Sequence, residues 1–214
     1  MTSWNHGYLY RFRIWSVGLV FGALMVATVK AHVLVSHAPA DSGILSNSSS
    51  QNADFMFAGT ASVTGISWWG TTLTNPDDLS KFEVRIFKGL DLPDSFIVAS
   101  GTTMQKPAGV DVQGSPISRF DLDLNATLHL ATGEYYLSIL NESQNQQWFW
   151  QLGTGGDGNN HFRVVDDTEW VLYDDGDYSL ELAVIPEPGS MALLLLAGTA
   201  LLLTRRQVRR RQLQ

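Results

Sequence analysis

The chain has 214 residues, no cysteine and a formal net charge of −7. All 21 acidic residues lie between Asp41 and Glu187, whereas eight of the 14 basic residues lie at or before Lys30 or at or after Arg205. The middle of the chain therefore has six basic against 21 acidic residues, a charge of −15 that excludes nucleic acid as a partner. Without disulfides, this stretch of roughly 145 residues up to Ile185 needs a core of its own and is long enough for one domain.

The first 31 residues have the pattern of a secretory signal peptide. Two arginines precede an apolar stretch, Ile14–Val29, which is followed by small residues. A positive end, a short apolar run and a small-residue end are the features of an export signal. We therefore expect residues 1–31 to form a signal helix, with cleavage after Ala31 or after Ala40. An uncleaved N-terminal anchor is the alternative, and it also leaves the middle of the chain exported.

Residues 32–53 follow, and their composition predicts a flexible leader. The part from Ser42 to Asn52 is rich in serine, asparagine and glutamine, which bury little apolar area. Two histidines, His32 and His37, lie in this stretch. We therefore do not expect either of them to belong to a folded site.

Residues 54–185 show the alternation of apolar and polar side chains that is typical of strands with one buried face. In one of these strands Phe82, Val84 and Ile86 alternate with Glu83 and Arg85. The same alternation occurs at residues 120–124, 134–139 and 180–184. Further strands are expected at residues 55–58, 61–69, 96–102, 147–152, 161–165 and 169–173.

Turn signals separate these expected strands. Runs of glycine, proline, asparagine and aspartate stand at Asn75–Asp78, Pro107–Gly109, Thr132-Gly133 and Asp174–Asp177. About eight to ten short strands in one domain predict an all-β fold. We expect residues 54–185 to form an antiparallel β-sandwich of the jelly-roll kind, with two sheets packed face to face.

This region has no pattern that is typical of a catalytic site. Nucleophilic catalysis needs a nucleophile, a base and an orienting group together, and the chain has neither cysteine nor a Gly-x-Ser-x-Gly motif. His129 lies between two leucines and is expected on a strand surface, and His161 has no companion at the spacing of a zinc site. No pair of acids is marked as a glycosidase pair. We expect a protein that is not an enzyme.

The domain is rich in tryptophan, and this favours either a packed core or a sugar-binding surface. Aromatic faces stack on sugar rings, so an exposed aromatic strip would suit a carbohydrate-binding module. Neighbours in a strand point to opposite faces, so one of Trp68 and Trp69 is expected in the core. Trp69 and Tyr136 are the candidates for exposed, sugar-stacking positions. The tryptophans of the domain are Trp68, Trp69, Trp148, Trp150 and Trp170.

Three aspartates around Gly176 form a candidate calcium site. Asp174, Asp175 and Asp177 are closely spaced, and calcium takes roughly six to eight oxygen ligands from such loops. Asp-Gly runs are also common hairpin turns, and the spacing does not match an EF-hand loop. A turn without metal is therefore the first expectation, with calcium as the only cofactor that the sequence suggests.

Residues 186–214 contain three elements in order: Pro186-Glu187-Pro188, the apolar run Met191–Leu203, and an arginine cluster. The prolines end the folded region, because they cannot extend a strand ladder. The apolar run predicts a short transmembrane helix, shorter than the roughly 20 residues of a stable span. The arginines orient it, since they resist translocation. They are Arg205, Arg206, Arg209, Arg210 and Arg211.

This order of elements resembles the PEP-CTERM sorting signal of bacterial exported proteins, over the chain from Ile185 onward. The resemblance implies that Pro186, Glu187 and Pro188 are recognised by a membrane-embedded, transpeptidase-like enzyme, an exosortase, which processes the chain near the triplet. Such signals are often found in species that make extracellular polysaccharide. An ordinary C-terminal anchor with a proline-rich stalk is the alternative.

The middle of the chain has a second resemblance. The strings SVTGISWWG, FEVRIFKG, GEYYLSILN and WFWQLGTG are similar in order and spacing to a sandwich domain of many PEP-CTERM proteins. This resemblance supports the fold and export, and it implies no activity.

The sequence thus predicts an exported, non-catalytic component of the cell surface or of an extracellular (biofilm) matrix. Its expected partners are the export machinery, an exosortase-type enzyme and the bacterial inner membrane, in which it is anchored before processing. A carbohydrate-binding module for extracellular polysaccharide is the alternative, and a polysaccharide-active enzyme is the third possibility.

Overall fold

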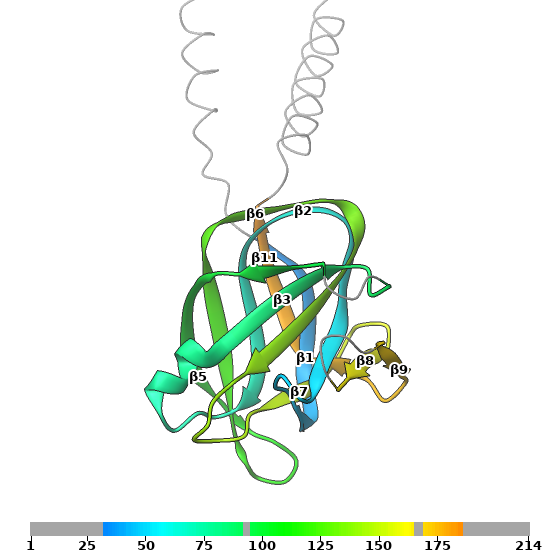
Figure 1. The fold of residues 1–214 in the computed structure, drawn as a ribbon. Helices are drawn as coiled ribbons and strands as arrows, with labels where there is room; N and C mark the ends of the chain where they lie inside the picture. The colour runs from blue at the N-terminus through cyan, green and yellow to red at the C-terminus, as the bar shows by residue number, and fades with distance from the viewer. Residues whose placement is uncertain (1–31, 92–94, 165–168, 186–214) are drawn as a thin grey trace, which may run out of the picture. The chain divides into compact units, whose positions relative to one another are not determined.

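The computed structural model of the protein describes residues 32–91, 95–164 and 169–185 (Figure 1). These residues form mostly β-strands, and every strand pairing is antiparallel, so the predicted all-β class is confirmed. The helical element of this part is η2, a 3₁₀ helix at Pro76–Lys81. In the same ranges no helix has the length and apolar character to cross a membrane. The predicted signal helix and sorting segment lie outside the described residues.

The described strands are hydrogen-bonded into one sheet, in which many neighbouring strands are not consecutive in the chain. Its main order is β10-β7-β1-β11-β2-β6-β3-β4, with β5 beside β6, β8 beside β2, and β9 beside β8. In chain order the strands are β1 (His32–Leu45), β2 (Gln51–Thr71), β3 (Phe82–Lys88), β4 (Phe96–Ala99), β5 (Gly101–Val110), β6 (Pro116–Asn141), β7 (Phe149–Thr154), β8 (Asn160–Arg163), β9 (Val171–Tyr173), β10 (Asp177–Tyr178) and β11 (Leu180–Ile185).

Two strands are longer than the turn signals predict. β2 has 21 residues and β6 has 26, and they pair along most of their length. In the middle of this ladder Gly59 faces Gly133, and Gly59 has a φ of 132°. Facing glycines let both strands bend at one place without ending the ladder, and β2 and β6 curve over together in Figure 1. The predicted turn at Thr132-Gly133 is therefore a bend inside β6.

A second predicted turn, at Pro107–Gly109, also lies within a strand. β5 continues from Gly101 to Val110 and pairs with β6 throughout, with a register shift between Pro107 and Gly109. β5 follows the outer side of β6, where a proline without an N–H group is tolerated at an edge or a bulge. The residues Pro107–Gly109 therefore shift the register of the β5–β6 ladder and do not end it.

The segment 32–53 is not a flexible leader, so that prediction is wrong. It forms β1 and the start of β2. Its polar side chains hydrogen-bond the backbone of the fold: Ser46 Oγ donates to the carbonyl of Ile139 (2.5 Å), and Asn52 Nδ2 donates to the carbonyl of Leu45 (2.7 Å). Both residues are buried. A polar composition is compatible with order here because the buried polar groups are paired.

The first and last described strands are neighbours. β11 lies between β1 and β2 in the sheet, and His32 of β1 is the register partner of Val184 of β11. Because the two strands are antiparallel, the start of β1 and the end of β11 lie at the same end of the sheet. The chain thus enters and leaves the described domain side by side.

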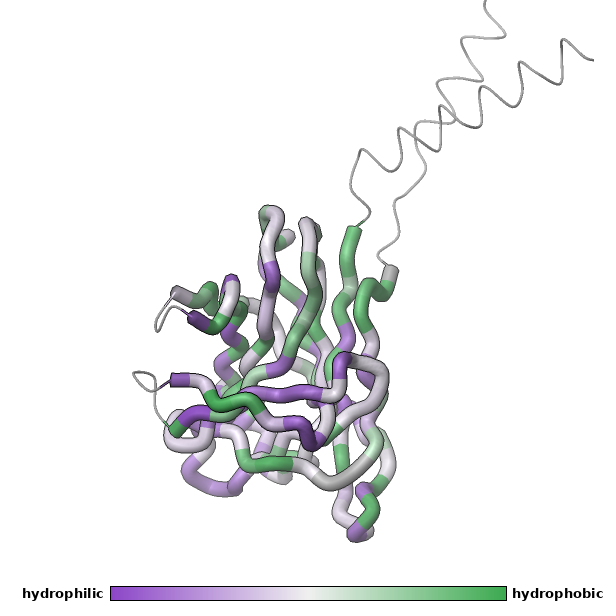
Figure 2. Tube along the Cα trace, turned by 90° about the vertical axis from the view of Figure 1, so that its right-hand side faces the viewer, coloured by the Kyte–Doolittle hydropathy of each residue, from purple (hydrophilic) through white to green (hydrophobic). Residues whose placement is uncertain are grey.

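The core is built around four aromatic rings, three from β2, β3 and β6 and one from the residue before β7. Trp68, Phe82, Phe120 and Trp148 pack around one another with ring centroids 4.9 to 6.0 Å apart. Alternate residues of β11 are buried in the same core, as the period of two requires. Figure 2 shows hydrophobic and hydrophilic residues alternating along the strands.

Candidate functional site

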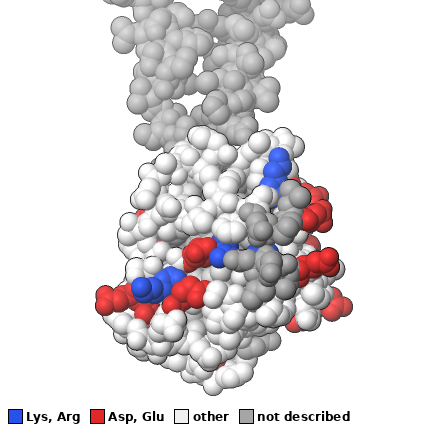
Figure 3. Space-filling model, viewed as in Figure 1, with Lys and Arg blue, Asp and Glu red and all other residues white. Residues whose placement is uncertain are grey.

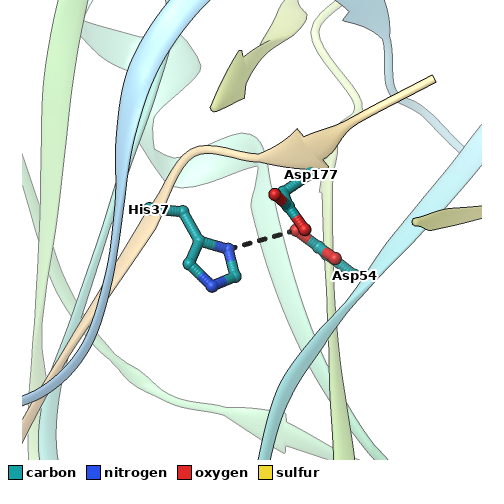
Figure 4. A group of neighbouring side chains, drawn as sticks. All are labelled: His37, Asp54 and Asp177. Carbon is teal, nitrogen blue, oxygen red and sulfur yellow. Dashed lines mark ion pairs between the residues drawn. The ribbon is translucent and has the colours of Figure 1, made fainter. Parts of the chain in front are cut away.

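A buried group of His37, Asp54 and Asp177 is the main candidate site. Each residue offers one nitrogen or carboxylate oxygen, and these three atoms all lie within 4.8 Å of one another. Within ranges 32–91, 95–164 and 169–185, this is the only group of three or more His, Asp or Glu residues that meets this criterion. Figure 4 shows the two carboxylates turned toward each other, with the imidazole ring beside them.

Three strands bring these side chains together: β1 and β2, which follow each other in the chain, and β10, which is distant from both in sequence. His37 lies on β1 opposite Leu180 of β11, Asp54 lies near the start of β2, and Asp177 begins β10. The exposed fractions of the three residues are 4 %, 0 % and 4 %. A solute in bulk water therefore has no direct access to these groups. The site is a buried cluster of polar side chains and not an open substrate pocket.

Only one of the two carboxylate oxygens of Asp54 has interaction partners. Its Oδ2 accepts a hydrogen bond from the Tyr178 backbone N–H (2.6 Å) and lies 3.4 Å from His37 Nδ1. The same Nδ1 lies 3.3 Å from the Tyr178 carbonyl oxygen. Asp54 Oδ1 is buried and has no hydrogen-bond partner among the residues that the structure describes. A carboxylate with one unpaired buried oxygen is unusual, because buried polar atoms are nearly always paired.

Burial and proximity shift the pKa values of this pair. Burial raises the pKa of Asp54 from 3.8 to about 6, although hydrogen bonds from His37 and Tyr178 oppose the shift. Burial by itself would lower the pKa of His37, but the hydrogen bond and charge of Asp54, together with the charge of Asp177, raise it above 6.5. His37 and Asp54 therefore retain their protons more strongly than the same groups do in water.

A glycine-rich loop covers the group. Asp177 accepts hydrogen bonds from the backbone N–H groups of Gly156 (3.1 Å) and Gly158 (2.9 Å). A Cβ atom on Gly156 would lie 2.2 Å from Asp177 Oδ1 and 2.7 Å from His37 Cε1. Only glycine allows the backbone to approach the site this closely. The peptide groups of the loop after β7 thereby hold it against Asp177 and His37.

The structure does not bring the three calcium candidates together as one site. Asp174 is exposed. Asp175 accepts a hydrogen bond from the side chain of Asn160 (2.5 Å), and Asp177 turns inward to His37 and Asp54. Sequence reasoning identified Asp177 but missed its partners. The false prediction of a flexible leader removed His37 from consideration, and no local spacing marks Asp54.

The two sugar-stacking candidates differ in accessibility. Trp69 is 9 % exposed, and the guanidinium carbon of Arg119 lies 4.9 Å from its ring centroid. The expectation that Trp69 is an exposed platform is therefore wrong, because its strand packs it under a neighbouring side chain. Tyr136 is half-buried, and its ring stands edge-on to Phe55 and to His161 at centroid distances of 5.7 and 5.4 Å.

The remaining histidines of the domain lie apart from the buried group. His129 is exposed on β6, as expected, and its Nδ1 lies 3.0 Å from Ser62 Oγ. His161 is half-buried on β8, and burial lowers its pKa. Neither residue belongs to the group of ligand atoms around Asp54.

The sorting residues Pro186, Glu187 and Pro188 and the five arginines lie outside the described residues. No protein-family model matches this chain, and neither a curated protein nor a solved structure matches it.

Proposed function

We propose that this is an exported, non-catalytic protein of the bacterial cell surface or extracellular matrix, sorted through its PEP-CTERM-like segment. The observation that carries the proposal is the pairing of His32 with Val184. Residues 1–31 and 186–214 both contain an apolar run, and both join the domain at this one end. A domain held at a membrane by both segments before processing needs its two chain ends on the same side.

The charge distribution supports this arrangement. The segments that form this end of the sheet are His32–Ser36, Ala58–Gly65, Asn125–Gly133 and Ala183–Ile185, and none contains a lysine, arginine, aspartate or glutamate. On the face drawn in Figure 3, most charged side chains lie in a band across the middle of the domain, with a basic and an acidic side chain higher on the right-hand side. The Lys88 side chain lies against Gly133 at this end. An end whose segments lack acidic residues can approach anionic headgroups, which would repel the acidic remainder of the domain.

Burial of the aromatic rings favours a structural role over sugar binding. Trp68, Trp148 and Trp150 are at most 1 % exposed, and Trp69 lies under Arg119. A sugar platform needs several exposed rings on one face. Tyr136 keeps the carbohydrate-binding alternative open. We also propose that the bent sheet closes as a sandwich, because β2 and β6 fold over around a shared aromatic core.

The sorting step is tested with one substitution in the Pro-Glu-Pro triplet. In cells that carry an exosortase, the wild-type chain should lose its C-terminal segment, whereas Glu187→Ala should block processing and leave the domain folded. Glu134→Ala is the matched control, because Glu134 is an exposed glutamate of β6. Mass spectrometry of the mature C-terminus measures the result. A wild-type chain that still ends at Gln214 in such cells would show a plain tail anchor.

The arginine cluster and the sugar alternative have separate tests. Replacing the five C-terminal arginines by serine should release unprocessed protein from the membrane fraction, since the short apolar run no longer has a stop signal. A glycan array probed with the purified protein tests the carbohydrate-binding alternative. Specific binding that is lost in Tyr136→Ala would favour that alternative over a purely structural role.

A further inference from the structure

We propose that His37, Asp54 and Asp177 form a binding site for a divalent transition-metal ion, with Zn²⁺ as the ion that suits the donors best. The site joins β1, β2 and β10. This inference does not depend on the proposed function, because it rests on the described side chains alone.

The donor set fits zinc better than calcium. The group offers one imidazole nitrogen and two carboxylate oxygens within 4.8 Å of one another. Zn²⁺ takes such ligands at about 2.0–2.2 Å, which places ligand atoms roughly 3–4 Å apart, so side-chain movements on the order of 1 Å would close the site. Calcium takes roughly six to eight oxygens and no nitrogen, and imidazole with carboxylate is typical of zinc and its neighbours in the first transition series.

An unpaired atom provides the second observation. Asp54 is 0 % exposed, and its Oδ1 has no hydrogen-bond partner within the described ranges. The carboxylate faces that of Asp177 in Figure 4. A buried carboxylate oxygen without a partner costs free energy, and a bound cation supplies that partner. The group is therefore more than a cluster of acids, because Asp54 Oδ1 lacks a partner and a metal ion would provide one.

The charges of the buried group also favour a divalent cation. Two buried carboxylates that face each other repel. The Gly156, Gly158 and Tyr178 peptide groups donate hydrogen bonds to them but carry no full positive charge. A divalent ion with a neutral imidazole would neutralise both carboxylates. His37 would then act as a ligand and not as the counter-ion.

Metal binding would fasten the start of the domain to its end. His37 is on the first strand, and Asp177 holds the glycine loop through Gly156 and Gly158. The loop covers the site, so opening of this loop gives a path for the ion. Binding to the folded state and not to the unfolded chain raises stability by mass action.

The test uses the full-length chain in detergent, stripped with a chelator and then supplied with Zn²⁺. We expect one bound Zn²⁺ per chain by elemental analysis and a rise in Tm of roughly 5–10 °C at 100 times Kd. Co²⁺ serves as a second probe, because its visible absorption reports nitrogen and oxygen ligation. A stripped wild-type chain that binds no stoichiometric Zn²⁺ and gives no Co²⁺ spectrum would overturn the proposal.

Substitutions locate the ion. Asp177→Asn and His37→Gln should abolish the Zn²⁺-dependent rise in Tm and the Co²⁺ spectrum. Asp174→Asn is the matched control, because Asp174 is an exposed aspartate of the same Asp174–Asp177 turn. Circular dichroism checks that each variant folds. If a variant does not fold, the Zn²⁺ and Co²⁺ titrations of the stripped wild-type chain still test whether the protein binds the ion. Undiminished binding in both site variants, or loss in Asp174→Asn as well, would contradict the proposed site.

Discussion

The rings of Trp150 and Tyr178 lie face to face, with centroids 4.5 Å apart and planes 19° from parallel. Trp150 Nε1 also donates a hydrogen bond to the Ser179 carbonyl (3.0 Å), and the Tyr178 hydroxyl donates to Asn52 Oδ1 (2.8 Å). Tyr178 follows Asp177 in sequence and binds Asp54 through its backbone. The stacked pair is therefore the apolar support of the buried histidine–aspartate group.

Removal of this support should be costly. Trp150 is 0 % exposed, so Trp150→Ala should lower the free energy of unfolding by about 3–5 kcal/mol. Tyr173→Ala is the control, because Tyr173 is 45 % exposed on β9; its cost should be below about 1 kcal/mol. Urea denaturation followed by fluorescence measures both. Equal losses would show that Trp150 does not belong to the cooperative core.

Asp121 should make the fold sensitive to acid. Burial alone raises its pKa, but hydrogen bonds from Lys106, Arg119 and Ser67 outweigh burial and lower the pKa from 3.8 to about 2. Because the folded-state pKa lies below the unfolded value, this stabilisation is present above pH 3.8 and is lost as the pH falls through about 2.

Asp121→Asn should therefore lower stability at pH 7 by about 1–3 kcal/mol and flatten this part of the pH dependence. Asp123→Asn, an exposed neighbour on β6, should keep the wild-type profile. Denaturant titrations between pH 7 and pH 2 compare the three proteins. If the Asp121→Asn and Asp123→Asn profiles coincide, the network does not contribute to stability.

Gly70 should tolerate no side chain. A Cβ atom there would lie 2.4 Å from Trp148 Cζ2 and 2.6 Å from the Phe149 carbonyl oxygen. Trp148 is 1 % exposed, so its ring has little room to move, and Gly70→Ala should cost about 1–3 kcal/mol. Gly65→Ala on the same strand has its nearest contact at 3.4 Å and should have a smaller effect. Thermal unfolding measures both, and the reverse order would contradict this packing.

The mature N-terminus should be His32. Cleavage after Ala40 would remove the whole of the pairing between β1 and β11, including the buried His37, whereas cleavage after Ala31 leaves β1 whole. N-terminal mass spectrometry of the exported protein measures the site. Ala31→Leu should block processing, and Ala40→Leu should not. A mature protein that begins at Asp41 would contradict this expectation.

Strands with a strict alternation were predictable from the sequence, because one buried face decides their pattern. β3 and β11 lie where the alternation places them. β1 was not predictable in this way, since its order depends on partners such as Leu180 opposite His37. The bend at Gly59 and Gly133 was mistaken for a turn, because a single glycine does not reveal that a second one faces it across the ladder.

The candidate site was less predictable than the fold. Tyr178, the neighbour of Asp177, lies 141 residues after His37 and 124 after Asp54, so no local spacing links the three side chains. In the sequence, Asp177 is recognisable only as part of the acidic turn Asp174–Asp177. The arrangement of strands β1, β2 and β10 was needed to separate it from Asp174 and Asp175.

The place of β11 between β1 and β2 sets the order of events for a chain that crosses a membrane N-terminus first. The strands that start the domain emerge early, but the ladder between them is completed only when residues 180–185 arrive. Such a contact, between the two ends of the chain, forms slowly because the whole intervening loop must close first. On the proposed export route, a molecule halted before Ile185 would remain incomplete, because the strand that lies between β1 and β2 would be missing.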